Sequence, residues 1–270
     1  MTNQDVSFVG AIPDIYDKYM VPLMFQPFAE DMAARVAALN PGAVLETAAG
    51  TGVVTRVLAP QLGRTARYVV TDLNTPMLDK ARSQQPEDAR LEWATADALN
   101  LPYEDDTFDA ACCQFGVMFF PDRVRGYAEA RRVLKPGAPF VFNVWDRLAD
   151  NAACSTIGGV VAAKYPDKPI DFMQRVPFGY SDQQRIRDDL KAGGFTKVEI
   201  QRVTHQGKAQ GPRDAAMAMV QGSPVRMEIL ARNEADLEEV TAEAEEALRK
   251  RFGDGPFTAQ IQALVVTASA

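Results

Sequence analysis

Residues 44–72 read VLETAAGTGVVTRVLAPQLGRTARYVVTD, and this stretch decides the fold. An apolar run ends at the acid Glu46 and is followed by a turn of small residues that contains Gly50 and Gly52. Apolar residues at helical spacing come next, and a second apolar run ends at Asp72. The pattern predicts a strand, a tight turn, a helix and a second, parallel strand, with an acid at the end of each strand. Ligands bind outside those ends in open parallel sheets.

The glycine turn suits a ligand that lies against the backbone. Gly50 and Gly52 have no Cβ to hold a ligand away, and a helix that starts near Gly52 directs free N–H groups at it. Asp72 follows the turn by about twenty residues, where an acid bonds ribose hydroxyls. A nicotinamide dinucleotide and S-adenosylmethionine (SAM) both fit. Thr55 stands where the dinucleotide pattern needs a third glycine, and the acid Glu46 would repel a pyrophosphate, so these residues favour SAM.

The composition is that of a globular protein. The chain has 270 residues, of which 47% are hydrophobic and 24% charged, and its net charge is −7. This length suffices for one large α/β domain or a domain with an inserted cap. The negative charge and the scarcity of Lys/Arg clusters argue against a nucleic-acid partner. We expect a reduced, cytoplasmic protein, because three cysteines lack disulfide or metal spacing and neither a secretory signal nor a run of about 20 apolar residues is visible.

The rest of the chain continues the alternation of strands and helices. Further strands are expected at 91–95, 108–114, 139–145, 195–204 and 257–267. Helices are expected at 14–39 with interruptions at Pro22 and Pro27, and at 75–83, 123–134, 151–163, 182–191 and 213–252, with Ser181 as a cap and a loop at 164–180. Strands separated by helices predict an α/β, doubly wound, mostly parallel sheet.

Four pieces of sequence, in this order, resemble the class I, Rossmann-like family of SAM-dependent methyltransferases. They are VLETAAGTG, VVTDLNTPMLDKAR, ADALNLPYEDDTFDA and ARRVLKPGAPFVFNVW, and the resemblance is nearest to the small-molecule branch that includes ubiquinone/menaquinone biosynthesis methyltransferases. It implies a seven-stranded sheet with helices on both faces and an antiparallel last strand. It also implies a single domain over 1–270, with a helical lid (1–39), a SAM-binding core (40–146) and substrate-cap insertions (147–180 and 205–255).

The resemblance implies SAM as the cofactor, S-adenosylhomocysteine as its product, and a role for each matching position. Glu46 matches the partner of the methionyl amino group, directly or through water, and Asp72 matches the acid that holds both ribose hydroxyls. Gln114 and Phe115 match the start of the loop that faces the methionine arm. The other positions expected to bind the cofactor are Ala48, Gly50, Gly52, Leu73, Met77, Asp97 and Ala98.

Three of these positions carry a more specific expectation. Leu73 is expected beside the adenine, and the pair Asp97–Ala98 is expected to meet the adenine amino group and ring. Asp97 has an alternative role as a cap of the turn at 100–102. Ala48 departs from the family, which more often has glycine there, so we expect a shifted loop that still binds.

Methyl transfer from a sulfonium is a direct displacement that needs mainly alignment and desolvation. A base is needed only if the acceptor must lose a proton, and His205, the only histidine, is the candidate, with a structural role as the alternative. The side chains expected to line the acceptor pocket are Tyr16, Tyr19, Met118, Phe119, Phe120 and Phe178. Such a lining predicts a small acceptor that is partly apolar or aromatic, methylated at O, N or C. A homodimer is compatible with the sequence.

Two other functions stay open at this point. A nicotinamide-dependent oxidoreductase would share the sheet, but the third glycine and a hydride-transfer constellation are not recognisable. A non-catalytic SAM-binding protein would carry the same residues as an enzyme, because this chemistry needs no signature base.

Overall fold

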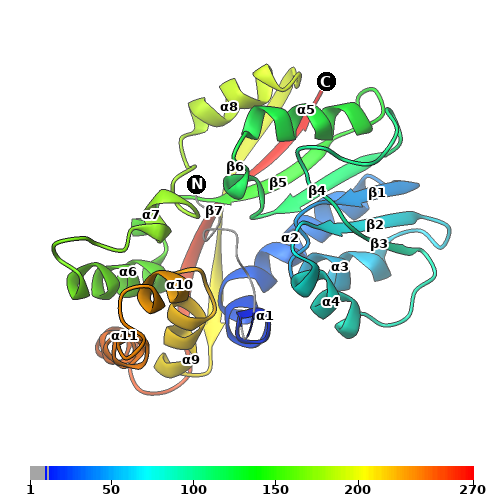
Figure 1. Ribbon diagram of the computed structural model, residues 1–270. Helices are drawn as coiled ribbons and strands as arrows, with labels where there is room; N and C mark the ends of the chain where they lie inside the picture. Colours follow the sequence, from blue (N-terminus) through cyan, green and yellow to red (C-terminus); the bar gives the residue numbers. More distant parts are fainter. Residues whose placement is uncertain (1–9, 11) are drawn as a thin grey trace. The chain divides into compact units, whose positions relative to one another are not determined.

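The computed structural model describes residues 10 and 12–270, which form two compact units (Figure 1). The sheet unit comprises Phe28–Trp145, Tyr180–Val203 and Ala263–Ala270. The helical unit comprises the described residues up to Pro27, Asp146–Gly179 and Thr204–Gln262. Residues 1–9 and 11 lie outside the described residues. Two predictions fall on them: the absence of a secretory signal and the first part of the helical lid. Within the described part, no helix is both long and apolar enough to cross a membrane.

A seven-stranded sheet forms the core of the sheet unit, in the order β3-β2-β1-β4-β5-β7-β6. The strands are β1 (Ala43–Glu46), β2 (Arg67–Asp72), β3 (Leu91–Thr95), β4 (Ala110–Gln114), β5 (Phe140–Trp145), β6 (Lys197–Ala209) and β7 (Phe257–Ser269). The β1–β2, β1–β4, β2–β3 and β4–β5 pairs are parallel, whereas β7 is antiparallel to β5. The predicted fold class is confirmed.

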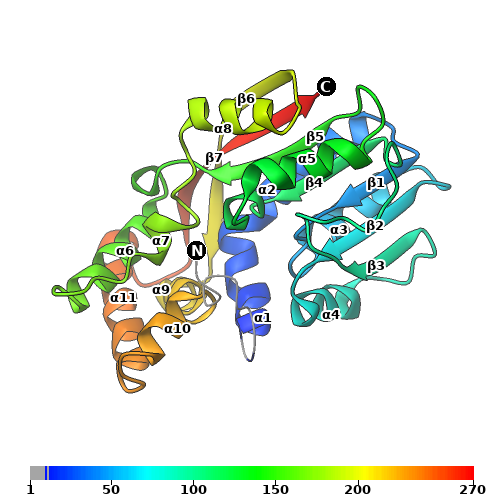
Figure 2. The same ribbon diagram turned by 45° about the horizontal axis from the view of Figure 1, so that its top comes forward.

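Helices accompany the sheet on both faces. Those of the sheet unit are α3 (Val53–Leu58), η3 (Ala59–Gln61), α4 (Thr75–Gln84), η4 (Val117–Phe119), α5 (Arg123–Val133) and α8 (Gln183–Ala192), with most of α2 (Gln26–Ala38). Phe140 and Phe142 pack against Tyr127 of α5, with ring centroids 6.3 and 5.5 Å away. Trp145 packs against Phe28 of α2 at 5.5 Å. Since strand residues alternate between faces, α2 and α5 cover opposite faces, as Figure 2 shows.

The helical unit is built around a long helix, α11 (Asp236–Phe252), which packs against α6 (Ala152–Lys164) and α9 (Pro212–Ala216). Its other helices are α1 (Ile12–Ile15), η2 (Tyr16–Phe25), η5 (Leu148–Asp150), α7 (Phe172–Arg175), η6 (Met217–Gln221) and α10 (Val225–Leu230). A Cβ on Gly207 would lie 1.8 Å from the carbonyl oxygen of Leu23. Only glycine therefore lets β6 pass this close to η2.

The amino-terminal segment differs from its prediction. Helical structure continues from α1 through η2 into α2, and Pro22 lies inside η2, which is a π-helix. Wide π-type turns accommodate irregularities in the hydrogen-bond ladder that would end an α-helix. Pro27 is the second residue of α2 and follows η2 without a break, because Gln26 is helical and donates its N–H to the carbonyl of Val21. The predicted interruptions at both prolines were therefore wrong.

Smaller differences occur in the carboxyl-terminal half. Asp182, rather than Ser181, caps α8, because its carboxylate accepts from the N–H groups of the next turn. The predicted loop at 164–180 contains the short helix α7, and β6 extends five residues beyond its predicted end at Thr204. The predicted helix at 213–252 is divided into α9, η6, α10 and α11, with breaks around Gly222 and after Leu230.

Candidate active site

The residues predicted to bind the cofactor all belong to the sheet unit. They follow the carboxyl ends of β3, β2, β1 and β4, which are neighbours in the sheet. Because these strands are parallel, their carboxyl ends meet at one edge, where open α/β sheets bind ligands. The sequence was sufficient to place these residues together.

The turn after β1 has the left-handed backbone that its glycines predicted. Gly50 and Gly52 have φ angles of +59° and +79°, and Gly52 precedes the first residue of α3. A Cβ on Gly52 would lie 2.8 Å from the Cβ of Ala81, and one on Gly50 would lie 3.7 Å from Met77 Cε. Gly52 thus also permits the close approach of α4, a packing role that the sequence did not reveal, whereas a Cβ on Gly50 would make an ordinary van der Waals contact.

Ala48 adopts the conformation that a glycine would take at its position. Its φ angle is +52°, a left-handed value that costs an L-residue about 1 kcal/mol or more. The following residue, Ala49, donates its N–H to the carbonyl of Thr71 at 3.0 Å. The turn is therefore tied to β2 as well as to β1.

Asp72 is buried and its carboxylate is fixed on both sides. Oδ2 accepts the N–H of Gly50 at 2.8 Å, and Oδ1 accepts the N–H of Asn74 at 2.7 Å. Burial raises the pKa of Asp72, and these two backbone bonds partly offset the rise. A carboxylate oxygen has two lone pairs, and each Asp72 oxygen accepts one of the two backbone N–H groups named above.

Glu46 is 1% exposed and bonded to two hydroxyl groups. Thr55 donates to Oε2 at 2.7 Å, and Tyr68 donates a short bond to the same oxygen. Burial raises the pKa of Glu46 to about 7 although both hydroxyls lower it, and the negative charge of Asp72 adds to the rise while Arg56 opposes it. Ligand cations favour the ionised form of such a group.

The two hydroxyls around Glu46 were missed by sequence reasoning. In the sequence, Thr55 stands out only because it replaces a glycine of the dinucleotide pattern, and Tyr68 is one member of an apolar run. The strand register explains the contact with Tyr68, because Glu46 pairs with Val70 and Tyr68, two residues earlier, lies on the same face as Val70.

The residues expected near the adenine have different environments. Leu73 is 56% exposed immediately after β2. Asp97 is exposed, its Oδ1 accepts the N–H of Leu99 at 2.9 Å, and its carbonyl accepts the N–H of Asn100 at 2.9 Å. Asp97 therefore caps its own turn at 97–100 rather than the expected turn at 100–102, and this bond occupies one of its two carboxylate oxygens. Ala98, next in the chain, is half-buried.

The turn after β4 is held by an aromatic cluster and an amide. Phe115 has a φ angle of +52°, and its N–H donates to Oδ1 of the buried Asn143 at 2.9 Å. Its ring stacks on Trp145 with centroids 3.7 Å apart and meets the edge of Phe28 at 5.3 Å. Gln114, the last residue of β4, is half-buried. Asn143 is a further residue that the sequence did not single out.

The residues predicted to line the acceptor pocket belong to both units. In the sheet unit, Met118 and Phe120 are buried and Phe119 is partly exposed. A Cβ on Gly126 would lie 2.5 Å from the ring of Phe120, so this ring packs on α5. Because these residues are divided between the two units, their common pocket stays a prediction.

The remaining predicted residues belong to the helical unit. Tyr16 stacks on Phe25 with centroids 5.0 Å apart, and the ring of Tyr19 lies 4.7 Å from Lys18 Nζ. Phe178 is buried, and His205 is half-buried on β6. The role of His205 as a base also stays a prediction.

Comparisons with known proteins agree with this geometry. Residues 45–142 match a family described as "Methyltransferase domain". A demethylmenaquinone methyltransferase of Clavibacter sepedonicus is 30% identical over 195 residues, which cover 64% of this chain and 76% of that protein. A demethylmenaquinone methyltransferase of Deinococcus radiodurans is 39% identical over 178 residues, which cover 60% and 71%.

A solved structure is similar in fold. The YcgJ protein of Bacillus subtilis has a TM-score of 0.58 and 18% identity, over 90% of this chain and 98% of that one. At this identity the likeness concerns the fold alone. Together with the two relatives, it shows that the chain belongs to the class I, Rossmann-like family of SAM-dependent methyltransferases, near the ubiquinone/menaquinone biosynthesis type.

Proposed function

We propose that this SAM-dependent methyltransferase binds its cofactor across the carboxyl ends of β1 to β4 and methylates a small, partly apolar or aromatic acceptor. One observation carries the proposal. Two buried carboxylates, Glu46 and Asp72, flank a left-handed glycine turn whose Gly50 N–H already bonds Asp72.

The residues present fit the chemical groups of SAM. The carboxylate of Asp72 suits the two ribose hydroxyls, and the exposed side chain of Leu73 offers an apolar surface to the adenine. The carboxylate of Glu46 suits the methionyl ammonium, whose charge would stabilise the ionised form. A pyrophosphate at the glycine turn would add negative charge beside Glu46, which makes a nicotinamide dinucleotide the poorer fit.

The methionine arm and the adenine are assigned to the remaining positions. Gln114 and Phe115 face the arm, and the bond from Phe115 to Asn143 supports this assignment by fixing the turn. Asp97 meets the adenine amino group with the oxygen that does not cap its own turn. The other positions assigned to the cofactor are Ala48, Gly52, Met77 and Ala98.

When bound, SAM supplies a methyl group already activated on a sulfonium. The chain's own residues then have to hold the acceptor in line with that methyl group and exclude water, which can lower a barrier by several kcal/mol, of order 7 at the effective molarities seen in intramolecular reactions. An acceptor that must lose a proton also needs a base, and His205 is the residue to test for it.

Two named relatives are demethylmenaquinone methyltransferases. We propose for this chain an acceptor of the same class, a quinone ring or its reduced, hydroxylated quinol form. The acceptor would contact Tyr16, Tyr19, Met118, Phe119, Phe120 and Phe178. In this proposal residues 1–270 form one methyltransferase domain, with 1–39 as a lid and 147–180 and 205–255 as cap insertions. The lid would exclude water while the methyl group moves.

The cellular setting is a further part of the proposal. Cys112, Cys113 and Cys154 are free and buried, which supports a cytoplasmic protein with reduced thiols. The net charge of −7 supports a small-molecule acceptor over a nucleic acid. A homodimer is the oligomeric state to test, by light scattering.

Calorimetric titration tests the cofactor assignment. We expect SAM and S-adenosylhomocysteine to bind, NAD not to bind, and Asp72→Ala to weaken adenosyl binding at least tenfold. Asp79→Ala is the matched control, because this exposed acid lies on α4 away from the strand end. Equal binding by wild type and Asp72→Ala would contradict the site.

Transfer of a labelled methyl group tests the acceptor class. The panel should contain quinols, simple phenols, aliphatic amines and a short RNA. Labelling of an aromatic hydroxylated compound supports the proposal. Labelling of the RNA or of the amines alone would overturn the acceptor class and leave the cofactor site standing.

A further inference from the structure

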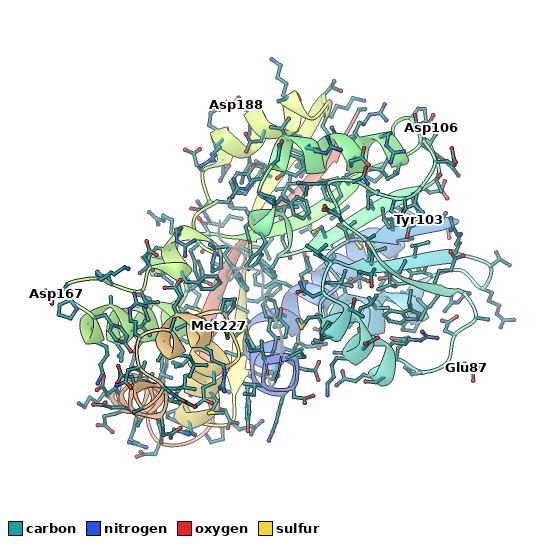
Figure 3. All side chains as sticks on the ribbon, viewed as in Figure 1. Glu87, Tyr103, Asp106, Asp167, Asp188 and Met227 are labelled. Carbon is teal, nitrogen blue, oxygen red and sulfur yellow. The ribbon has the colours of Figure 1, made fainter. Side chains whose placement is uncertain are left out.

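The connection between β3 and β4, residues 96–109, has no helix, yet one face of α5 holds its backbone. Arg125 Nε donates to the carbonyl of Leu99 at 2.7 Å. Arg132 donates to the carbonyls of Leu101 and Tyr103 at 2.9 and 2.7 Å. Figure 3 labels Tyr103 and Asp106, which belong to this connection.

A third side chain completes the contact. Glu129 accepts the N–H of Leu101 at 2.9 Å and is bonded in turn by Arg132 through both carboxylate oxygens, at 2.8 and 3.0 Å. Arg132 also bonds the carboxylate of Asp105 at 2.8 Å. The neighbouring guanidinium lowers the pKa of Glu129, which keeps this acid ionised.

The spacing on both partners explains the fit. Residues 125, 129 and 132 share one face of a helix. The contacted residues of the connection are 99, 101, 103 and 105, every second position along its series of turns and bends. The planar guanidinium of Arg132 bonds two carbonyls and two acids at once, which a lysine could not do.

The contact reaches Asp97 through a single residue. Leu99 donates its N–H to Asp97 Oδ1 at 2.9 Å, while its carbonyl accepts from Arg125. Asn100 donates its N–H to the carbonyl of Asp97, so the turn that orients this acid is anchored directly to α5.

We propose that Arg125, Glu129 and Arg132 are positioning residues for adenine recognition, because they fix the connection that carries Asp97 and Ala98. This inference rests on the proposed cofactor role of Asp97. Without these bonds the connection would have to become ordered each time the cofactor binds. The entropy cost of that ordering would weaken the hydrogen bond between Asp97 and the adenine amino group.

Discrimination between two ligands tests the proposal better than affinity alone. S-adenosylhomocysteine and S-inosylhomocysteine differ only at the purine, where the inosyl compound has an oxygen in place of the amino group. We expect wild type to prefer the adenosyl compound by about tenfold or more, the value of one specific hydrogen bond. Calorimetry gives this ratio for each variant, and a protein that is merely less stable but correctly folded keeps it.

The variants are Arg132→Met, Arg125→Met and Asp97→Ala. Arg125→Met is the milder change, because Arg125 is exposed and makes one bond to the connection, so it serves if Arg132→Met does not fold. Arg131→Met is the matched control, since Arg131 lies on α5 and bonds Leu134 rather than the connection.

Loss of most of the preference in Asp97→Ala and in Arg132→Met or Arg125→Met, with the ratio unchanged in Arg131→Met, supports the proposal. Loss in Asp97→Ala with full preference in both arginine variants overturns the positioning role and leaves the role of Asp97 standing. If Asp97→Ala keeps the full preference for the adenosyl compound, Asp97 does not recognise the adenine amino group, and the positioning role of the three α5 residues is contradicted as well.

Discussion

The methyl group of Ala48 occupies the space that a side chain at Gly116 would need. A Cβ on Gly116 would lie 2.5 Å from the Cβ of Ala48 and 2.6 Å from Cys113 Sγ. The turns after β1 and β4 therefore interlock at this pair. The glycine at 116 provides the room that Ala48 requires.

This contact predicts that Gly116→Ala destabilises the protein. Its backbone needs no glycine, since φ is −101°, so the cost comes from overpacking, about 1–3 kcal/mol of unfolding free energy. Ala48→Gly should recover part of the loss by removing one of the two clashes and the left-handed strain. Denaturant unfolding measures both. Gly63→Ala is the control, because nothing lies within 4 Å of its Cβ position. Equal stability of Gly116→Ala and wild type would contradict the packing argument.

The affinity for SAM should depend on pH through Glu46. The ligand-free pKa is about 7, and the ammonium of a bound cofactor would lower it. Affinity should therefore rise as pH increases towards 7 and level off above it, with a proton released on binding below pH 7. Calorimetry in buffers of different ionisation enthalpy detects that proton. Glu46→Gln should bind more weakly and without the slope, and a slope that persists in this variant would point to another group.

The stability of the ligand-free protein should change with pH in the opposite direction. An unfolded glutamate ionises near pH 4.5, whereas folded Glu46 keeps its proton to about 7, so the folded state binds more protons between these values. Stability should fall as pH rises through that window, by about 3 kcal/mol at 1.36 kcal/mol per unit. The difference in unfolding free energy between wild type and Glu46→Gln isolates this contribution. A difference that is constant from pH 4.5 to 7 would show that Glu46 has an ordinary pKa.

Removing the Tyr68 hydroxyl should move the titration of Glu46. Tyr68→Phe deletes a bond that favours the ionised acid, so the pKa of Glu46 should rise and the pH midpoint of SAM affinity should shift upwards. Tyr103→Phe is the matched control, because its buried hydroxyl has no hydrogen-bond partner among the described residues. If Tyr68→Phe leaves the pH midpoint of SAM affinity unchanged, the Tyr68 hydroxyl does not affect the ionisation of Glu46 in the cofactor site.

The sequence predicted the parts of the fold that depend on local pattern. The strand, glycine turn and helix at 44–58 follow from apolar periodicity and from residues that permit positive φ, and the structure places each where expected. The path across Pro22 was missed because a π-helix leaves no periodic signal of its own. The order of the strands was not predicted, since strand pairing joins residues far apart in the chain.

For the candidate site, the sequence identified the acids and glycines at the strand ends and missed the groups that hold them. Tyr68, Asn143 and Arg132 act across 22 to 31 residues of sequence, so no local motif reveals them. Tyr16 and His205 belong to the helical unit, whereas the residues assigned to the cofactor belong to the sheet unit. Their roles towards the acceptor therefore remain predictions.

The stack of Trp145 on Phe115 makes the protein's own fluorescence a reporter of the turn after β4. The chain has two tryptophans, and the other, Trp93, lies on β3. Trp93→Phe would leave one indole, buried and 3.7 Å from the ring whose backbone forms that turn. Emission from this single indole would then follow movement of the turn in real time, without any label added to the protein.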